Sequence, residues 1–110
     1  MMAKNAQELL YARQAQIAKA VAHPVRIAVL DFLQSGEQCV CDIAEAVGSE
    51  RSNVSRHLSV MVAAGVLSCR KDGLKVLYTI KTPCILQFFG CITKVIKSQA
   101  RENEQLLQAM

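Results

Sequence analysis

The sequence predicts a mainly α-helical domain with one small β-hairpin, in the order four helices, hairpin, helix. Two observations support this fold class. Apolar residues recur at helical spacing over most of the chain, and two β-rich runs flank the dipeptide Asp72-Gly73. The chain has 110 residues, of which 52% are hydrophobic and 20% are charged. This length and composition are typical of a globular protein with one domain, so we expect residues 1–110 to form a single domain.

Pro24 separates the first two predicted helices. Apolar residues recur near helical spacing through residues 6–22, which predicts an amphipathic first helix. Pro24 interrupts this pattern because the residue before a proline avoids helical geometry. The same proline suits the first turn of a second helix at residues 25–33, and Gly36 follows that helix as its terminator.

Two helices joined by a tight turn come next. Residues 40–47 predict a third helix that is closed by Gly48, and Ser49 is a suitable N-cap for a fourth helix over about residues 50–64. One face of this fourth helix is apolar. Its opposite face carries small polar and basic side chains, namely Arg51, Ser52, Asn53, Ser55, Arg56 and Ser59. A helix with these two faces can pack on a core and present polar groups to a DNA groove.

The pattern then changes to that of a hairpin followed by a long helix. Residues 66–70 and 75–80 are β-rich, and Asp72-Gly73 between them predicts a wing over about residues 66–81. Pro83 opens a last helix over about residues 83–108, whose first half is strongly apolar. An apolar helix at the end of a small domain needs a partner. We therefore expect a homodimer that pairs helices 6–22 and 83–108.

This order of elements predicts a winged helix-turn-helix with double-stranded DNA as its partner. In that arrangement the fourth helix enters the major groove and basic wing residues meet phosphates. The charge agrees with this interpretation, because the net charge is +4 and residues 51–81 carry six Lys and Arg residues against one acid, Asp72.

Other classes of protein are disfavoured by the sequence. No apolar run is long enough to span a bilayer and the N-terminus lacks a signal-peptide core, so we expect a cytoplasmic protein without membrane contact. A small thiol enzyme is disfavoured because no strand leads into a βαβ unit, and His23 and His57 lie at a helix boundary and on the proposed DNA face. A protein-interaction module would leave the basic helix and wing unexplained.

Three segments in order resemble the ArsR/SmtB family of metal- and redox-responsive repressors: HPVRIAVLDFL, CVCDIAEAVG and SNVSRHLSVMVAAGVLSCRKDGLKVLYTI. The resemblance covers roughly residues 7–80. It implies a homodimer that represses its operator and releases it when an inducer binds. The candidate DNA-contacting residues are Arg51, Ser52, Asn53, Ser55, Arg56 and His57 on the reading helix, and Arg70, Lys71 and Lys75 on the wing. The alternative for the helix residues is a solvated polar face, and the alternative for His57 is a capping or packing role.

Five cysteines in a chain without a leader argue against a structural disulfide framework. Cys39 and Cys41 are the most informative, because CVCD at the start of the third helix resembles arsenic- or cadmium/lead-sensing members of the family. Thiolates suit soft ions, so the resemblance implies As(III), Sb(III), Cd(II) or Pb(II) as inducer, with no obligatory cofactor. The alternative for this pair is two buried, inert thiols.

The spacing of Cys39 and Cys41 predicts a mechanism. On a regular helix, residues two apart point about 200° apart, so one ion could bind both only if the first turn unwinds. We expect this distortion to shift the fourth helix off the groove.

The thiol pattern departs from the family in three ways. Ala44 stands where many arsenic-sensing relatives have a third cysteine, and no cysteine precedes Cys39 to serve as a ligand from an N-terminal arm. The last helix has neither His nor Asp, which disfavours the zinc site of other members.

Cys84 and Cys91 form a second candidate thiol site near the start of the last helix. They are seven residues apart, and on an intact helix their Cα atoms would be about 10 Å apart, too far for a disulfide. They could meet if the helix begins after Cys84, breaks near Gly90 or pairs across a dimer. They could also join Cys39 and Cys41, respond to oxidants or persulfides, or simply pack in the dimer core. Cys69, in the first wing strand, is interpreted as structural.

Overall fold

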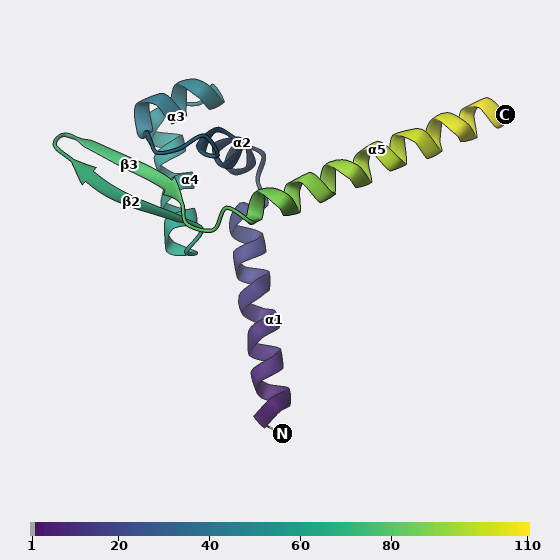
Figure 1. The fold of residues 1–110 in the computed structure, drawn as a ribbon, viewed down its shortest axis with the longest axis horizontal. Coiled ribbons are helices and arrows are strands. Elements are labelled where there is room, and N and C mark those ends of the chain that lie inside the picture. Colours follow the sequence, from purple (N-terminus) through teal and green to yellow (C-terminus); the bar gives the residue numbers. More distant parts are fainter. Residues whose placement is uncertain (1) are drawn as a thin grey trace.

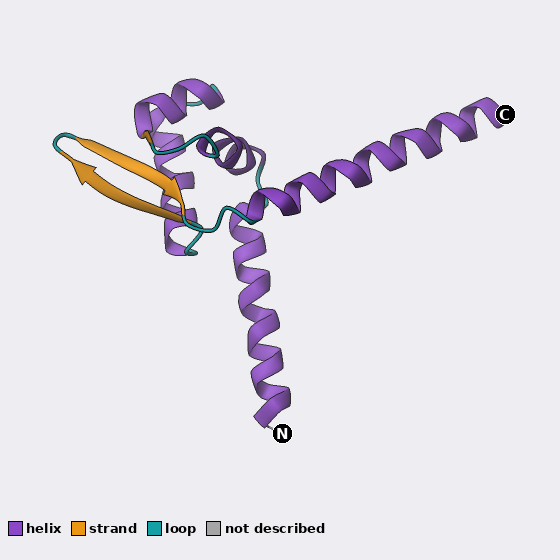
Figure 2. Ribbon diagram, viewed as in Figure 1, coloured by secondary structure: helices purple, strands orange, loops and turns teal. Residues whose placement is uncertain are grey.

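The computed structural model describes residues 2–110, and it confirms a mainly helical fold with the predicted order of helices and hairpin (Figure 1). Figure 2 shows the elements by type. In chain order they are α1 (Met2–Val21), α2 (Pro24–Leu33), β1 (Gln38–Cys39), α3 (Val40–Val47), α4 (Arg51–Ala63), β2 (Leu67–Asp72), β3 (Lys75–Ile80) and α5 (Ile85–Ala109).

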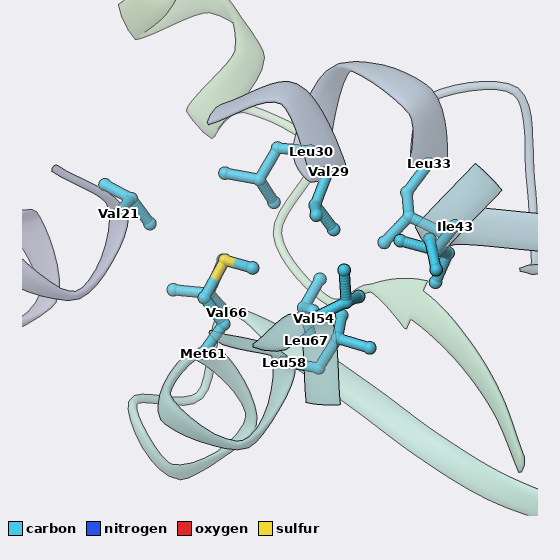
Figure 3. Close-up of a cluster of buried hydrophobic side chains, with 11 residues drawn as sticks. Val21, Val29, Leu30, Leu33, Ile43, Val54, Leu58, Met61, Val66 and Leu67 are labelled. Atoms are coloured by element: carbon cyan, nitrogen blue, oxygen red, sulfur yellow. The ribbon is translucent and has the colours of Figure 1, made fainter. Parts of the chain in front are cut away.

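The hydrophobic core lies between α2, α3, α4 and the start of β2 (Figure 3). Leu30, Ile43 and Leu58 are completely buried there, one from each helix. Burying an apolar side chain of this size stabilises the fold by about 1.5–3 kcal/mol. The rest of the buried cluster is Val21, Val29, Leu33, Ala44, Val54, Met61, Val66 and Leu67. The apolar stripe of α4 is therefore held inward, and its polar face is turned outward.

The wing belongs to a three-stranded antiparallel sheet rather than to a hairpin alone. Its order is β1-β3-β2, and β1 places Gln38 opposite Tyr78 and Cys39 opposite Leu77. The sequence did not predict β1. The addition matters because it joins the segment that carries Cys39 directly to the wing.

The predicted turn at Asp72-Gly73 is confirmed. Asp72 pairs with Lys75, which leaves Gly73 and Leu74 as a two-residue loop, and Gly73 has a φ of 64°. No residue other than glycine has a positive φ in the described chain. A positive φ at the first loop position alone is typical of a type II′ turn, which favours glycine there.

Several predicted helix ends need correction by a few residues. α1 begins at Met2 rather than at residue 6. The N-cap of α4 is Glu50, without a side-chain cap, and the prediction of Ser49 is wrong by one position. Ser49 instead accepts a hydrogen bond from the Asn53 amide at 2.8 Å. α5 begins at Ile85, because the two residues before it form a turn in which Leu86 N–H bonds the Pro83 carbonyl.

The helices α1 and α5 project from this body as two arms (Figure 1), and the molecule measures 61 × 48 × 22 Å. α5 has no buried residue and exposes Phe88, Ile92, Val95 and Ile96. Within residues 2–110, no helix combines the length and the apolar character needed to cross a membrane. The arms therefore offer a large apolar surface that the body of the same chain does not cover.

Candidate DNA interface and thiol site

The turn between α3 and α4 sets the direction of the candidate reading helix. α3 ends at Val47, and the next residue, Gly48, caps it with a left-handed φ of 67°. The Gly48 N–H bonds back to the carbonyls of Ala44 and Glu45. Ser49 and Glu50 follow, and Arg51 then begins α4. Since Val54, Leu58 and Met61 are buried, the remaining face of α4 is set toward solvent.

The residues predicted to contact DNA on α4 differ in their solvent exposure and in their hydrogen bonds within the chain. Arg51, Ser52 and Arg56 are exposed, whereas Asn53 and Ser55 are half-buried. Asn53 is held by Ser49, as described above. The structure thus brings five predicted residues to one outward face, with Arg56 the most clearly available cation near its middle.

His57 lies differently from the other predicted DNA-contacting residues, because it faces α2. Its Nδ1 accepts a hydrogen bond from Arg26 Nε at 2.9 Å, and its ring lies 4.4 Å from the ring of His23, between centroids. His23 is itself the N-cap of α2, where its Nδ1 accepts the N–H of Val25 at 3.1 Å. His57 therefore joins α4 to α2, and no local pattern in the sequence indicates Arg26 and His23 as its partners.

The pKa of His57 predicts a pH dependence of stability. Burial, and then the nearby His23, Arg26 and Arg56, lower this pKa below its usual value. The folded chain then binds this proton less tightly than the unfolded chain. The contribution of neutral His57 to the free energy of unfolding is complete above the unfolded histidine pKa of about 6.5. It is lost as the pH falls through the lower pKa of the folded chain. We expect urea unfolding to show a falling free energy of unfolding from pH 7.5 to 5.5, and a smaller fall in His57→Gln. An identical pH dependence in both proteins would contradict this assignment.

Arg70, predicted to contact DNA from the wing, is paired within the chain. Its Nε and Nη2 donate to the two carboxylate oxygens of Glu37 at 2.8 and 2.7 Å. The hydrogen bond from Arg70 lowers the pKa of Glu37, which stays ionised. Lys71 and Lys75 are exposed. Of the three predicted wing residues, Arg70 is therefore already paired, and its partner Glu37 is a residue that the sequence did not single out.

Cys39 and Cys41 line one cavity of about 310 Å³ between α3, the start of α4 and the start of β3. Cys39 is buried and is the N-cap of α3 with extended backbone (φ −86°, ψ 162°), whereas Cys41 is exposed in the first turn. The expectation based on two residues within a regular helix is therefore wrong, because Cys39 precedes the helix. The other lining residues are Val40, Arg51, Ser55, Leu74, Lys75 and Val76.

Arg51 links this cavity to the reading helix. Its guanidinium donates a hydrogen bond to the Cys41 sulfur. This hydrogen bond, together with the electrostatic attraction between the two groups, raises the pKa of Arg51 above its already high value. The sequence predicted Arg51 only as a DNA contact, since nothing in the spacing of residues 41 and 51 indicates that they meet.

The remaining cysteines lie apart from this cavity. Cys84 is exposed at the N-cap of α5 and lines a groove of about 380 Å³ between α1 and α5, together with Ile17 and Phe88. Cys91 is exposed on α5, and Cys69 is exposed on β2. Cys69, interpreted from the sequence as structural, is therefore not part of the buried core. α5 begins after Cys84, which is one of the conditions under which Cys84 and Cys91 could meet.

No group of three His, Cys, Asp or Glu side chains within residues 2–110 is placed to hold a metal ion. Among the described residues, the cavity of Cys39 and Cys41 offers two thiols and no third ligand of these types. This agrees with the presence of Ala44 where a third cysteine was considered.

Comparison with known proteins places the chain among bacterial regulators. Residues 23–68 match the family model described as "Bacterial regulatory protein, arsR family". An uncharacterized HTH-type transcriptional regulator of Mycobacterium tuberculosis, Rv0081, is 37% identical over 102 residues, which are 92% of this chain and 90% of the relative. Its crystal structure aligns with a TM-score of 0.73 and 34% identity over 86% of this chain and 95% of that one.

Two further relatives bear on dimerisation and ligands. A homodimeric winged helix-turn-helix DNA-binding domain from Mycobacterium bovis aligns with a TM-score of 0.74 and 26% identity, over 87% of this chain and 89% of that one. An arsenical resistance operon repressor of Staphylococcus xylosus is 32% identical over 68 residues, which are 62% of this chain and 65% of the relative.

Proposed function

The chain belongs to the ArsR family of bacterial regulatory proteins, and from this premise we propose a homodimeric repressor that releases its operator when Cys39 and Cys41 bind a soft metal or metalloid. Members of the family are DNA-binding transcriptional regulators, so this chain is a regulator and not an enzyme. The preferred ligands are As(III) and Sb(III), with Cd(II) and Pb(II) as the other soft ions that two thiols suit. The observation that carries the proposal is the shared cavity of these two cysteines beside the start of the reading helix.

The DNA-binding half of the proposal assigns α4 to the major groove and the wing to the phosphates. Ser52, Arg56 and Arg51 lie exposed on α4, with Asn53 and Ser55 beside them. Lys71, Lys75 and, in competition with Glu37, Arg70 supply the positive charge of the wing. His57 is assigned to packing against α2 instead, since Arg26 already occupies its Nδ1.

The pair between Glu37 and Arg70 leads to a prediction about affinity. Glu37→Gln removes a carboxylate that competes with phosphate for Arg70, so operator affinity should rise by up to about fivefold, the range expected for an exposed ion pair. The slope of log affinity against log salt should become steeper by about one phosphate contact. Fluorescence anisotropy with labelled operator at several salt concentrations measures both. Glu102→Gln, an equal charge change on the distant half of α5, is the control and should not change the slope.

The sensing half of the proposal follows from thiol chemistry. Arsenous acid can exchange two hydroxyls for two thiols. Two As–O bonds break, two As–S bonds form, and the thiol protons leave with the hydroxyls as two waters. Cys39 and Cys41 supply two sulfurs, and the third position on arsenic keeps its hydroxyl. Because Cys39 is also paired through β1 with β3, binding at this site would strain the junction of wing and α3.

The test compares two double variants, Cys39→Ser/Cys41→Ser and Cys84→Ser/Cys91→Ser, under reducing conditions. Operator release is titrated with As(III), Sb(III), Cd(II), Pb(II) and Zn(II). We expect As(III) or Sb(III) to release the wild type and the second variant, and to leave the first variant bound. Unchanged release in the first variant rules out the sensing site proposed here.

A second candidate is a thiol redox or persulfide sensor of the same fold, built on Cys84 and Cys91. The observation that favours it is the position of Cys84 outside the regular helix, exposed beside the groove between α1 and α5. Mass spectrometry separates the two candidates. A metalloid adduct on reduced protein supports the first, and loss of two hydrogens or gain of sulfur at Cys84 and Cys91 supports the second.

A further inference from the structure

Arg51 stands at the junction of two parts of the molecule that the proposed function must connect. It is the first residue of α4, on the exposed face next to Ser52, and its guanidinium reaches back to the sulfur of Cys41 on α3. It also lines the cavity that contains Cys39. One side chain is therefore shared between the thiol cavity and the end of the helix that faces DNA.

A ligand in the thiol cavity would compete with this contact. An arsenic atom bonded to both sulfurs lies between them, and it uses a lone pair of the Cys41 sulfur that the guanidinium now contacts. A sulfur bonded to arsenic shares its electron density with that bond, so it is a weaker acceptor for a cationic donor than the free sulfur. The guanidinium then loses both its acceptor and the space beside it.

We propose that Arg51 is the coupling residue, which holds its DNA-facing position through Cys41 and loses that position when the thiol cavity is filled. This inference rests on the proposed function, because it takes Cys39 and Cys41 as the ligand-binding pair. A guanidinium fixed by an acceptor has less conformational freedom to lose when it meets a phosphate or a base edge. Release from Cys41 would remove this advantage at the N-terminal end of α4, where groove contacts are made.

Arg56 provides a matched control on the same helix. It carries the same charge, is exposed, and has no hydrogen bond to a cysteine among the described residues. Both arginines are proposed to contact DNA, so replacing either should weaken operator binding. Only Arg51 touches the cavity, so only its replacement should change the response to ligand.

The experiment compares Arg51→Gln, Arg51→Lys and Arg56→Gln with the wild type, as full-length dimers. Three quantities are measured: operator affinity without ligand, operator affinity with saturating As(III), and the stoichiometry of As(III) on the reduced protein by native mass spectrometry. A ratio of the two affinities of about 5 to 150 is typical of coupled sites. Thermal melting checks that each variant is folded.

We expect both glutamine variants to lose roughly tenfold in operator affinity without ligand. In Arg51→Gln the ratio of operator affinity without As(III) to that with As(III) should fall below about twofold, while the stoichiometry of bound As(III) stays unchanged. Arg56→Gln should keep the wild-type ratio. Arg51→Lys should regain affinity through its charge but keep a reduced ratio, because an ammonium lacks the planar fork of the guanidinium.

Two results overturn the inference and can be told apart. A full wild-type ratio in Arg51→Gln, with As(III) still bound, removes Arg51 from the coupling but leaves the sensing site standing. Absence of As(III) from Cys39 and Cys41 in the wild type removes the sensing site itself, and the coupling with it.

Discussion

Replacing Leu58 by alanine is expected to lower the free energy of unfolding by about 2–5 kcal/mol, the range seen for large-to-small changes in a core. Leu58 is completely buried in the cluster between α2, α3 and α4. The cavity left behind would lie beneath the reading helix. A small domain has about 5–15 kcal/mol of stability in total, so this change removes a large part of it. Urea unfolding followed by circular dichroism measures the difference.

Val60→Ala is the control for this prediction. Val60 lies two residues away on the same helix and is 39% exposed, so its truncation should cost well under 1 kcal/mol. Operator binding by Leu58→Ala should be recovered at low temperature if the variant refolds. Equal destabilisation by the two changes would mean that α4 is not packed through its Leu58 face.

The double variant Ile92→Glu/Ile96→Glu is expected to give a monomer with operator affinity lower by about 10²- to 10⁴-fold, the advantage that linked binding of two half-sites provides. Both side chains are exposed on α5, with exposed fractions of 39% and 59%, so two carboxylates there cost the free subunit little. In a dimer that buries this face, the same carboxylates lose their hydration without gaining a partner. Light scattering gives the mass, and anisotropy with labelled operator gives the affinity.

The control places the same two charges on the opposite side of α5. Gln87→Glu/Ser98→Glu adds two carboxylates at exposed positions about 120–180° around the helix from Ile92 and Ile96. This protein should remain a dimer and lose affinity only modestly. If the Ile92→Glu/Ile96→Glu protein is still a dimer, the subunit interface does not lie on this face of α5.

Local signals were sufficient to predict most of the fold. The spacing of Val54, Leu58 and Met61 indicated the buried face of α4, and Asp72-Gly73 indicated the turn of the wing. Each of these signals depends on neighbours within one helical turn or one hairpin. The same is true of the start of α2, where Pro24 follows a capping His23.

The features that the sequence could not predict depend on contacts between distant residues. β1 is two residues long and exists only because it pairs with Leu77 and Tyr78 of β3. The pairs of Arg26 with His57 and of Glu37 with Arg70 span 31 and 33 residues. Charged and polar side chains carry no periodicity that indicates their partners. For this reason the polar face of α4 and the basic character of the wing could be predicted, but not which of their side chains are already engaged within the chain.

The uncovered apolar faces of α1 and α5 also affect how operator occupancy depends on the concentration of the repressor. With α1 and α5 unpaired, a single subunit has half of a two-part DNA surface. Below the dissociation constant of the dimer, the amount of dimer rises with the square of the subunit concentration. Operator occupancy then rises as the square as well, so halving synthesis reduces occupancy about fourfold in that range. A cell that dilutes the protein by growth would cross from repression to expression over a narrow interval.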